Sequence, residues 1–177
     1  MSLGIKLVQA LQKEAAMKRP FPMNVEAHDT VKSGRKDRAV SAQMRLCDND
    51  RLSHLAEKVL VHAEGPPRDS ETLARRFAEK TTYLSESLQF VECAANGAAV
   101  VRSTPETMRA PRTPYFEAKV SGGEITLRRY KPNAERPGRE AVPFCVTDET
   151  LVRLIDDAAS VLTGTAPSGK TANKSGE

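Results

Sequence analysis

Two turns that contain glycine, each flanked by alternating apolar and polar residues, constrain this fold more than any other sequence feature. The first is Asn96-Gly97, which lies between segments 88–94 and 98–103. An Asn-Gly pair favours the left-handed backbone that a two-residue hairpin turn requires. The sequence therefore predicts a tight antiparallel hairpin in which Cys93 lies opposite Val100.

The second turn, Gly122-Gly123, separates alternating segments 115–120 and 125–130. A two-residue turn here brings apolar residues together on one face and polar residues together on the other. The predicted opposite pairs are Val120 with Ile125, Ala118 with Leu127, Phe116 with Arg129, Lys119 with Thr126, Glu117 with Arg128 and Tyr115 with Tyr130. Because turn residues, alternation and the Glu117–Arg128 charges agree, a single register is expected.

Three further segments alternate with the period of two that indicates half-buried strands. Segments 23–28 and 40–46 flank the polar basic stretch 32–38, which predicts a hairpin with a long loop. Segment 142–146 contains Pro143, which has no N–H to donate to a neighbouring strand. This segment is therefore expected at an edge of the sheet, where a partner strand can extend it.

Four segments show the apolar spacing of amphipathic helices. They are residues 3–18 with Ser2 as N-cap, 49–63, 70–83 with Asp69 as N-cap, and a last helix between the N-cap Thr147 and Gly164. Prolines end the first helix, and glycine and proline end the second. The first helix is basic and amphipathic, and we expect it to cover the core or a partner rather than a membrane.

Together these segments predict an α+β protein, an antiparallel meander of about five strands with helices packed on one face. The expected organisation is an N-terminal amphipathic helix (1–19), a single α+β domain (20–163, compact over 49–163) with the N-terminal hairpin appended, and a tail. The tail, residues 164–177, has nothing apolar to bury, and we expect it to be disordered.

The formal net charge of +4 conceals alternating blocks. Residues 1–47 hold nine basic and four acidic residues, and 102–139 hold the same numbers, whereas 48–101 and 140–177 each have a net charge of −3. The candidate basic patch is Lys32, Arg35, Lys36, Arg38, Arg128, Arg129, Lys131, Arg136 and Arg139. Tyr115 and Tyr130 lie near its second half, as in surfaces that hold phosphates and stack bases.

No arrangement typical of an enzyme or a cofactor site stands out. Residues 164–171 match the string of a phosphate-binding loop, but they follow a helix and no helix-forming sequence comes after them. His28, His54 and His62 lack the spacing of metal ligands. We therefore expect no catalytic residue, no cofactor and no metal.

Cellular context is indicated only by what the sequence lacks. It has no apolar run long enough for a membrane span and no secretory signal pattern, and its three cysteines form no pair, so a cytoplasmic protein is expected. The leading hypothesis is a small non-enzymatic module that acts through a protein partner or as a homo-oligomer. The alternative is sequence-independent nucleic-acid binding through the basic loops.

Overall fold

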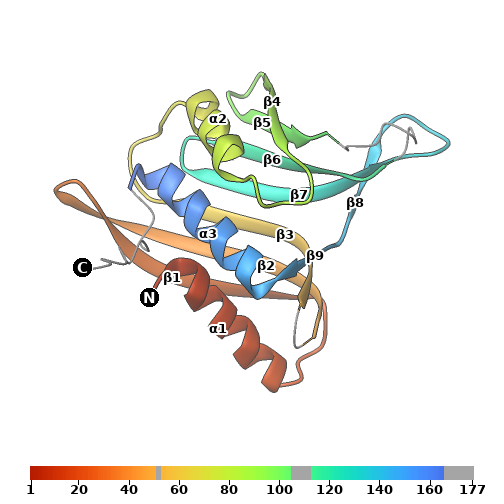
Figure 1. Ribbon diagram of the computed structural model, residues 1–177, viewed down its shortest axis with the longest axis horizontal. Helices are drawn as coiled ribbons and strands as arrows, with labels where there is room; N and C mark the ends of the chain where they lie inside the picture. Colours follow the sequence, from red (N-terminus) through yellow and green to blue (C-terminus); the bar gives the residue numbers. More distant parts are fainter. Residues whose placement is uncertain (51–52, 105–112, 166–177) are drawn as a thin grey trace, which may run out of the picture.

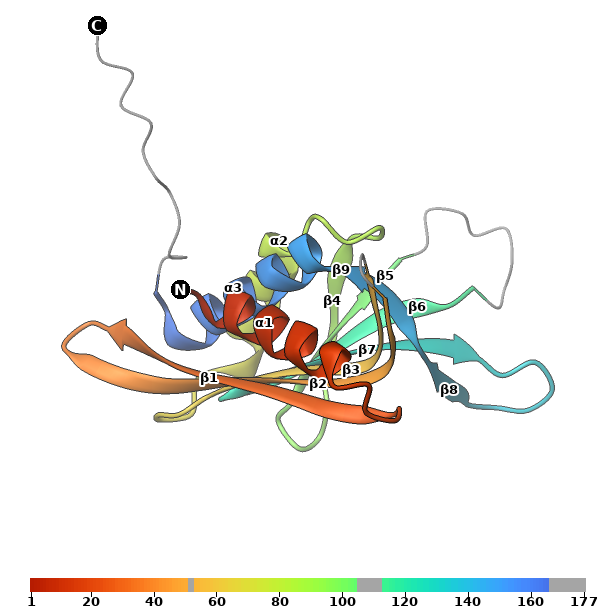
Figure 2. The ribbon, with the colours of Figure 1, turned by 90° about the horizontal axis from the view of Figure 1, so that it is seen from below.

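The computed structural model describes residues 1–50, 53–104 and 113–165. Within these residues the chain forms one antiparallel sheet of nine strands with three helices on one face (Figures 1 and 2). The elements are α1 (Leu3–Ala16), β1 (Met23–Ser33), β2 (Lys36–Asn49), β3 (Ser53–Ala63), α2 (Ser70–Lys80), β4 (Leu88–Cys93), β5 (Ala99–Ser103), β6 (Tyr115–Ser121), β7 (Glu124–Pro132), β8 (Arg139–Val142), β9 (Phe144–Thr147) and α3 (Asp148–Thr163). The α+β class is confirmed, but the sheet is larger than the predicted meander of about five strands, because the N-terminal hairpin and β3 belong to it.

The strand order is β1-β2-β3-β7-β6-β5-β4, so the sheet is not a simple meander. β3 pairs with β7 only from Val59 to His62, and the two strands then diverge. The short strands β8 and β9 lie in the opening, with β8 paired to β7 and β9 paired to β3. The main path of the described sheet therefore ends at β1 and β4, and the short strands β8 and β9 each have one partner strand.

The N-terminal hairpin belongs to this sheet and has no long loop. β1 and β2 pair in register up to Ser33 and Lys36, leaving a two-residue turn. Gly34 has φ +68° there, a conformation that favours glycine in hairpin turns. The predicted loop 32–38 is therefore wrong, because the polar side chains belong to a hairpin that projects beyond the helices and buries few of its residues (Figure 2).

The predicted helix over 49–63 is also wrong, since most of this segment is β3. The register between β2 and β3 shifts where Arg45 pairs with Lys58 but Leu46 pairs with Ala56, so Glu57 is an extra residue in a bulge. Buried residues alternate on either side of the bulge but lie three apart across it, at Ala56 and Val59. A spacing of three between buried residues is also typical of an amphipathic helix.

The predicted register is correct for one of the two glycine hairpins and wrong for the other. Every predicted pair of the β6–β7 hairpin is confirmed. In the β4–β5 hairpin Cys93 lies opposite Ala99 instead of Val100, so the predicted register is wrong by one residue. The cause is a longer turn: the Ala94 N–H donates to the Ala98 carbonyl, and Gly97 adopts φ +79° in a three-residue loop.

Pro143 lies in an edge segment as predicted, since β8 and β9 each pair with a single described strand, but it divides the predicted strand into two. Pro143 lies between β8 and β9, at the point where the chain stops pairing with β7 and starts pairing with β3. A residue at that junction needs no ladder hydrogen bond, which explains why proline fits there. Among the described strands β8 pairs only with β7 and β9 only with β3, so each keeps one side without a ladder.

The other predicted helices are confirmed: α1 and α2 end two and three residues earlier than predicted, and α3 has the predicted bounds. Ser2, Asp69 and Thr147 accept hydrogen bonds from first-turn N–H groups as N-caps, and Gly164 ends α3 with φ +72°. The helices cover one continuous core that includes Leu7, Phe77, Leu127, Leu154 and Ile155. α1 thus packs on its own sheet. Of the expected tail, residues 166–177 lie outside the described part of the chain.

Candidate functional site

The face of the sheet opposite the helices is uncovered in the described part of the chain (Figure 2). Strand alternation places Ala118 and Leu127 in the core under the helices, so Glu117 and Arg128 point the other way. The register then aligns charged residues of neighbouring strands in a row. Arg45 lies opposite Lys58 between β2 and β3, and Arg128, Glu117 and Arg102 lie opposite one another from β7 to β5. Lys58 and Arg128 lie directly beyond the pair of Val59 with Leu127, the last pair between β3 and β7.

Glu117 is a buried charged residue of this face. It is only 7% exposed, and it accepts a hydrogen bond from Arg102 Nε at 2.6 Å. Arg139 of β8 donates to both of its carboxylate oxygens, with Nη2 at 2.8 Å from Oε1. Burial alone would raise the pKa of Glu117, but the hydrogen bonds and charges of the two arginines outweigh burial and hold that pKa below its usual range.

Two tyrosines complete what we call the arginine–tyrosine cluster, which consists of Arg102, Tyr115, Glu117, Tyr130 and Arg139. The Arg139 guanidinium lies 3.9 Å from the centre of the Tyr130 ring, and Nη1 donates to the Tyr115 hydroxyl at 3.0 Å. Arg102 lies 5.9 Å from the Tyr115 ring centre. These contacts fix planar side chains in one arrangement, and the pKa of Arg139 is raised chiefly by its hydrogen bonds to Glu117.

Positive charge surrounds the cluster on the same face. Arg45 is paired with Glu57 at 2.8 Å. Lys58, Lys119 and Arg128 have no ion pair among the residues that the structure describes. Because Glu117 neutralises one of its two arginines, the face keeps an excess of cations that attracts acidic groups.

The candidate basic patch does not form one surface. Lys32, Arg35 and Lys36 are exposed at the tip of the β1–β2 hairpin, and Arg38 is half-buried against Gly65. The hairpin tip and the β7–β8 loop, which carries Arg136, lie at opposite ends of the molecule (Figure 1).

The second half of the patch is itself divided between the two faces of β7. Arg128 and Arg139 belong to the uncovered face. Arg129 points to the helix side, where it donates to Glu86 at 3.0 Å and lies 4.5 Å from the Phe116 ring centre. Lys131 is exposed and alternates with Tyr130.

Sequence reasoning missed Arg102, Lys58 and the role of Glu117. The confirmed β6–β7 register correctly placed Glu117 opposite Arg128, but Glu117 forms its ion pairs with arginines of β5 and β8. Those strands approach β6 and β7 through tertiary pairing that no local pattern encodes.

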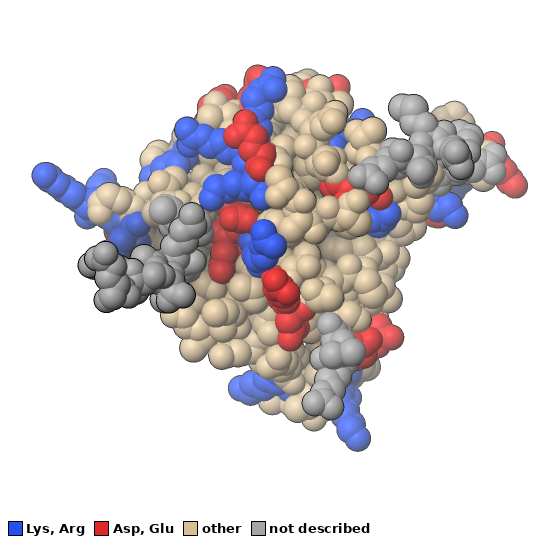
Figure 3. Space-filling model, in the orientation of Figure 1, with Lys and Arg blue, Asp and Glu red and all other residues tan. Residues whose placement is uncertain are grey.

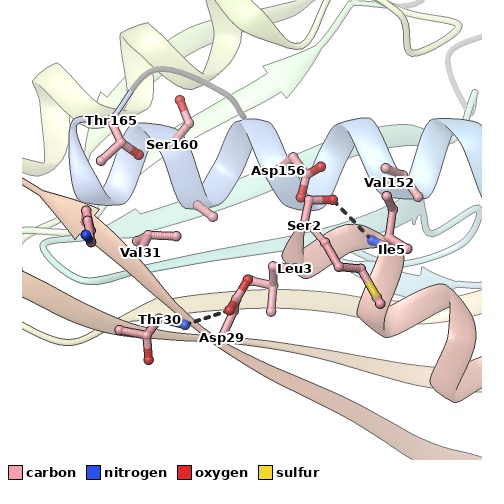
Figure 4. A pocket seen from close by; sticks show the side chains of 13 residues that line it. Ser2, Leu3, Ile5, Asp29, Thr30, Val31, Val152, Asp156, Ser160 and Thr165 are labelled. Atoms are coloured by element: carbon pink, nitrogen blue, oxygen red, sulfur yellow. Dashed lines mark hydrogen bonds between the residues drawn. The ribbon is translucent and has the colours of Figure 1, made fainter. Parts of the chain in front are cut away.

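The helix side offers weaker candidates. Acidic and basic side chains alternate there in a band (Figure 3). Ion pairs of the helices include Lys80–Asp157, between α2 and α3, and Arg75–Glu71 within α2. A hollow of about 740 Å³ lies between the start of α1, the second half of α3 and β1 (Figure 4). Its carboxylates are already engaged, because Asp156 accepts from the Gly4 N–H at 2.9 Å and Asp29 pairs with Lys6.

The histidines and cysteines form no catalytic arrangement. His54 is buried, with Nδ1 2.5 Å from Asn49 Oδ1 and Nε2 2.5 Å from Asp148 Oδ1, so it ties β3 to the start of α3. Cys93 and Cys145 are exposed and Cys47 is half-buried, and burial raises the pKa of the Cys47 thiol. Over the described ranges no three His, Cys, Asp or Glu side chains gather as metal ligands would.

No helix in the described part of the chain has the length and apolar character that crossing a bilayer would require. Comparisons of the chain with known protein families, with curated proteins and with solved structures return no match.

Proposed function

We propose that this protein is a non-enzymatic binding module that holds an acidic protein partner against the uncovered face of its sheet. The observation that carries the proposal is the arginine–tyrosine cluster, in which buried Glu117 fixes two arginines and through them two tyrosines. Arginine and tyrosine are enriched among the residues that dominate protein interfaces. Side chains already ordered before binding lose less conformational entropy when a partner arrives.

Sequence-independent nucleic-acid binding is the second candidate, supported by Lys58, Lys119 and Arg128 of the same face, which have no ion pair with a described residue. Two observations favour a protein instead. One side of the Tyr130 ring is occupied by Arg139, which reduces the ring surface left for stacking bases. The basic residues at the β1–β2 tip lie too far away to extend the same phosphate track (Figure 1).

Charge reversal at Arg128 tests the proposal. Arg128 lies beside the cluster and forms none of its hydrogen bonds, so Arg128→Glu changes the face without removing a partner of Glu117. The matched control is Lys36→Glu, which makes the same change in net charge at the exposed hairpin tip. Both variants and the wild type would be immobilised and used to capture proteins from a cell lysate, with quantification by mass spectrometry.

The proposal predicts that wild type and Lys36→Glu retain the same acidic proteins equally. Arg128→Glu is expected to retain them at least about tenfold less, which corresponds to a loss of roughly 1.4 kcal/mol in binding free energy. Equal retention by all three proteins would refute it. A fluorescent single-stranded oligothymidylate is measured in parallel at about 50 and 200 mM salt. Tight binding that falls steeply with salt and is lost in Arg128→Glu would indicate that the ligand of this face is a nucleic acid and not a protein.

A further inference from the structure

The outer edge of β1 is a long, regular strand edge. β1 pairs with β2 along all eleven of its residues without a bulge, and no described strand pairs with its other side. β4, at the far end of the sheet, has six residues, and its register shifts beside Val91. A regular edge presents backbone N–H and C=O groups that another strand can extend.

The direction of these backbone groups follows from the neighbouring strand. The Glu64 N–H donates to the Ala39 carbonyl at 2.9 Å, so the backbone of Ala39 faces away from β1. Thr30, which lies opposite Ala39, must therefore direct its own N–H and C=O outward, since opposite residues alternate between bonded and non-bonded pairs. The outward groups of β1 belong to its even-numbered residues, from Asn24 to Lys32.

A charged pair closes the middle of this edge. Lys6 of α1 lies 2.7 Å from Asp29 Oδ1, and the same Asp29 oxygen accepts from the outward Thr30 N–H at 2.8 Å (Figure 4). Lys6 Nζ also lies 3.5 Å from the outward His28 carbonyl oxygen. Two adjacent outward groups are thus occupied by side chains. Charged side chains are a known way to protect a strand edge from pairing.

We propose that the β1 edge is a pairing surface for a second copy of this chain, and that the Lys6–Asp29 pair holds it closed. The charge pattern of the strand selects the partner. In an antiparallel pair centred on Asp29, Glu26 lies opposite Lys32 of the second copy at both ends, and His28 lies opposite Thr30. The only like-charge contact is Asp29 opposite itself at the symmetry axis. Asp29 therefore opposes pairing both by closing the edge and by repulsion.

Removing Asp29 tests this inference, which is independent of the uncovered face. Asp29→Thr and Asp29→Val both introduce residues that favour strands, and far-UV circular dichroism checks their folding. Sedimentation velocity from low to high micromolar concentration is expected to show a monomer of 19.3 kDa for wild type. For the variants the mass is expected to rise with concentration towards twice that value.

Two further variants make the test specific. Adding Thr30→Pro to Asp29→Thr removes an outward N–H that no β1–β2 hydrogen bond uses, so the dimer is expected to revert to a monomer. Asp37→Thr, at an exposed aspartate of β2, is the matched control and is expected to stay monomeric. A monomeric Asp29→Thr, a dimer that persists with Thr30→Pro, or assemblies larger than a dimer would each overturn the proposal.

Discussion

The conversion of Glu117 to glutamine isolates the charge of the buried carboxylate from its shape. Three hydrogen bonds from Arg102 and Arg139 reach Glu117, two at Oε2 and one at Oε1. In glutamine the two at Oε2 can keep a neutral amide oxygen as acceptor, whereas the one at Oε1 is lost because an amide NH2 does not accept. Each weakened bond costs about 1 kcal/mol and the lost bond at least as much, which gives about 3 kcal/mol in all. The side chains of Arg102 and Arg139 are 38% and 34% exposed, and water compensates part of the loss.

We therefore expect Glu117→Gln to lower the free energy of unfolding by about 2 kcal/mol at neutral pH, which is equivalent to about 4–8 °C in Tm for a chain of this size. Urea denaturation, monitored by circular dichroism, measures this free energy of unfolding. Glu57→Gln is the matched control, because Glu57 pairs with one arginine at the surface of the same face. This variant is expected to lower the free energy of unfolding by less than about 1 kcal/mol.

The pH dependence gives a second readout. The pKa of Glu117 is lower in the folded protein than in the unfolded chain, so its charge stabilises the fold above the unfolded pKa of about 4.3 and ceases to do so as pH falls through the folded pKa. The difference between wild type and Glu117→Gln should be largest at neutral pH and narrow below about pH 4. Equal stabilities at pH 7, or a difference independent of pH, would refute the reasoning.

Three further substitutions test the packing, each by chemical denaturation. Gly4→Ala brings a Cβ within 2.6 Å of the Val152 carbonyl oxygen and is expected to cost about 1–3 kcal/mol, whereas Ile5→Ala at the exposed neighbouring position should cost less. Phe77→Ala empties a fully buried site and should cost about 3–5 kcal/mol; a value below 1 would contradict the assigned core. Thr147→Ala removes the α3 N-cap and should cost about 1 kcal/mol, and no loss would argue against that cap.

The elements that could be predicted from the sequence are those whose signals are local. The caps of α1, α2 and α3 lie within three residues of the N–H groups they satisfy. The β6–β7 register follows from Gly122-Gly123 and its flanks. In contrast, the bulge at Glu57 depends on how β3 pairs with β2, and the spacing it leaves in the sequence is that of a helix.

The candidate site was accessible to sequence reasoning only in part. The sequence singled out four residues of this region, Tyr115, Tyr130, Arg128 and Arg139. The confirmed β6–β7 register places both tyrosines and Arg128 as predicted. The contact between Arg139 and Glu117 spans 22 residues and requires β8 to enter the opening between β3 and β7. Neither the polar stretch before β8 nor Pro143 indicates that placement.

The insertion of β8 and β9 also has a consequence for the order in which the protein folds during synthesis. β3 leaves the ribosome about 60 to 90 residues before β7 and β9, the strands that cover its second side. Until then α1, β1, β2 and β3 form an incomplete unit with an open edge at β3. Contacts of such high sequence separation form slowly, so the nascent chain depends on its C-terminal third to close the sheet.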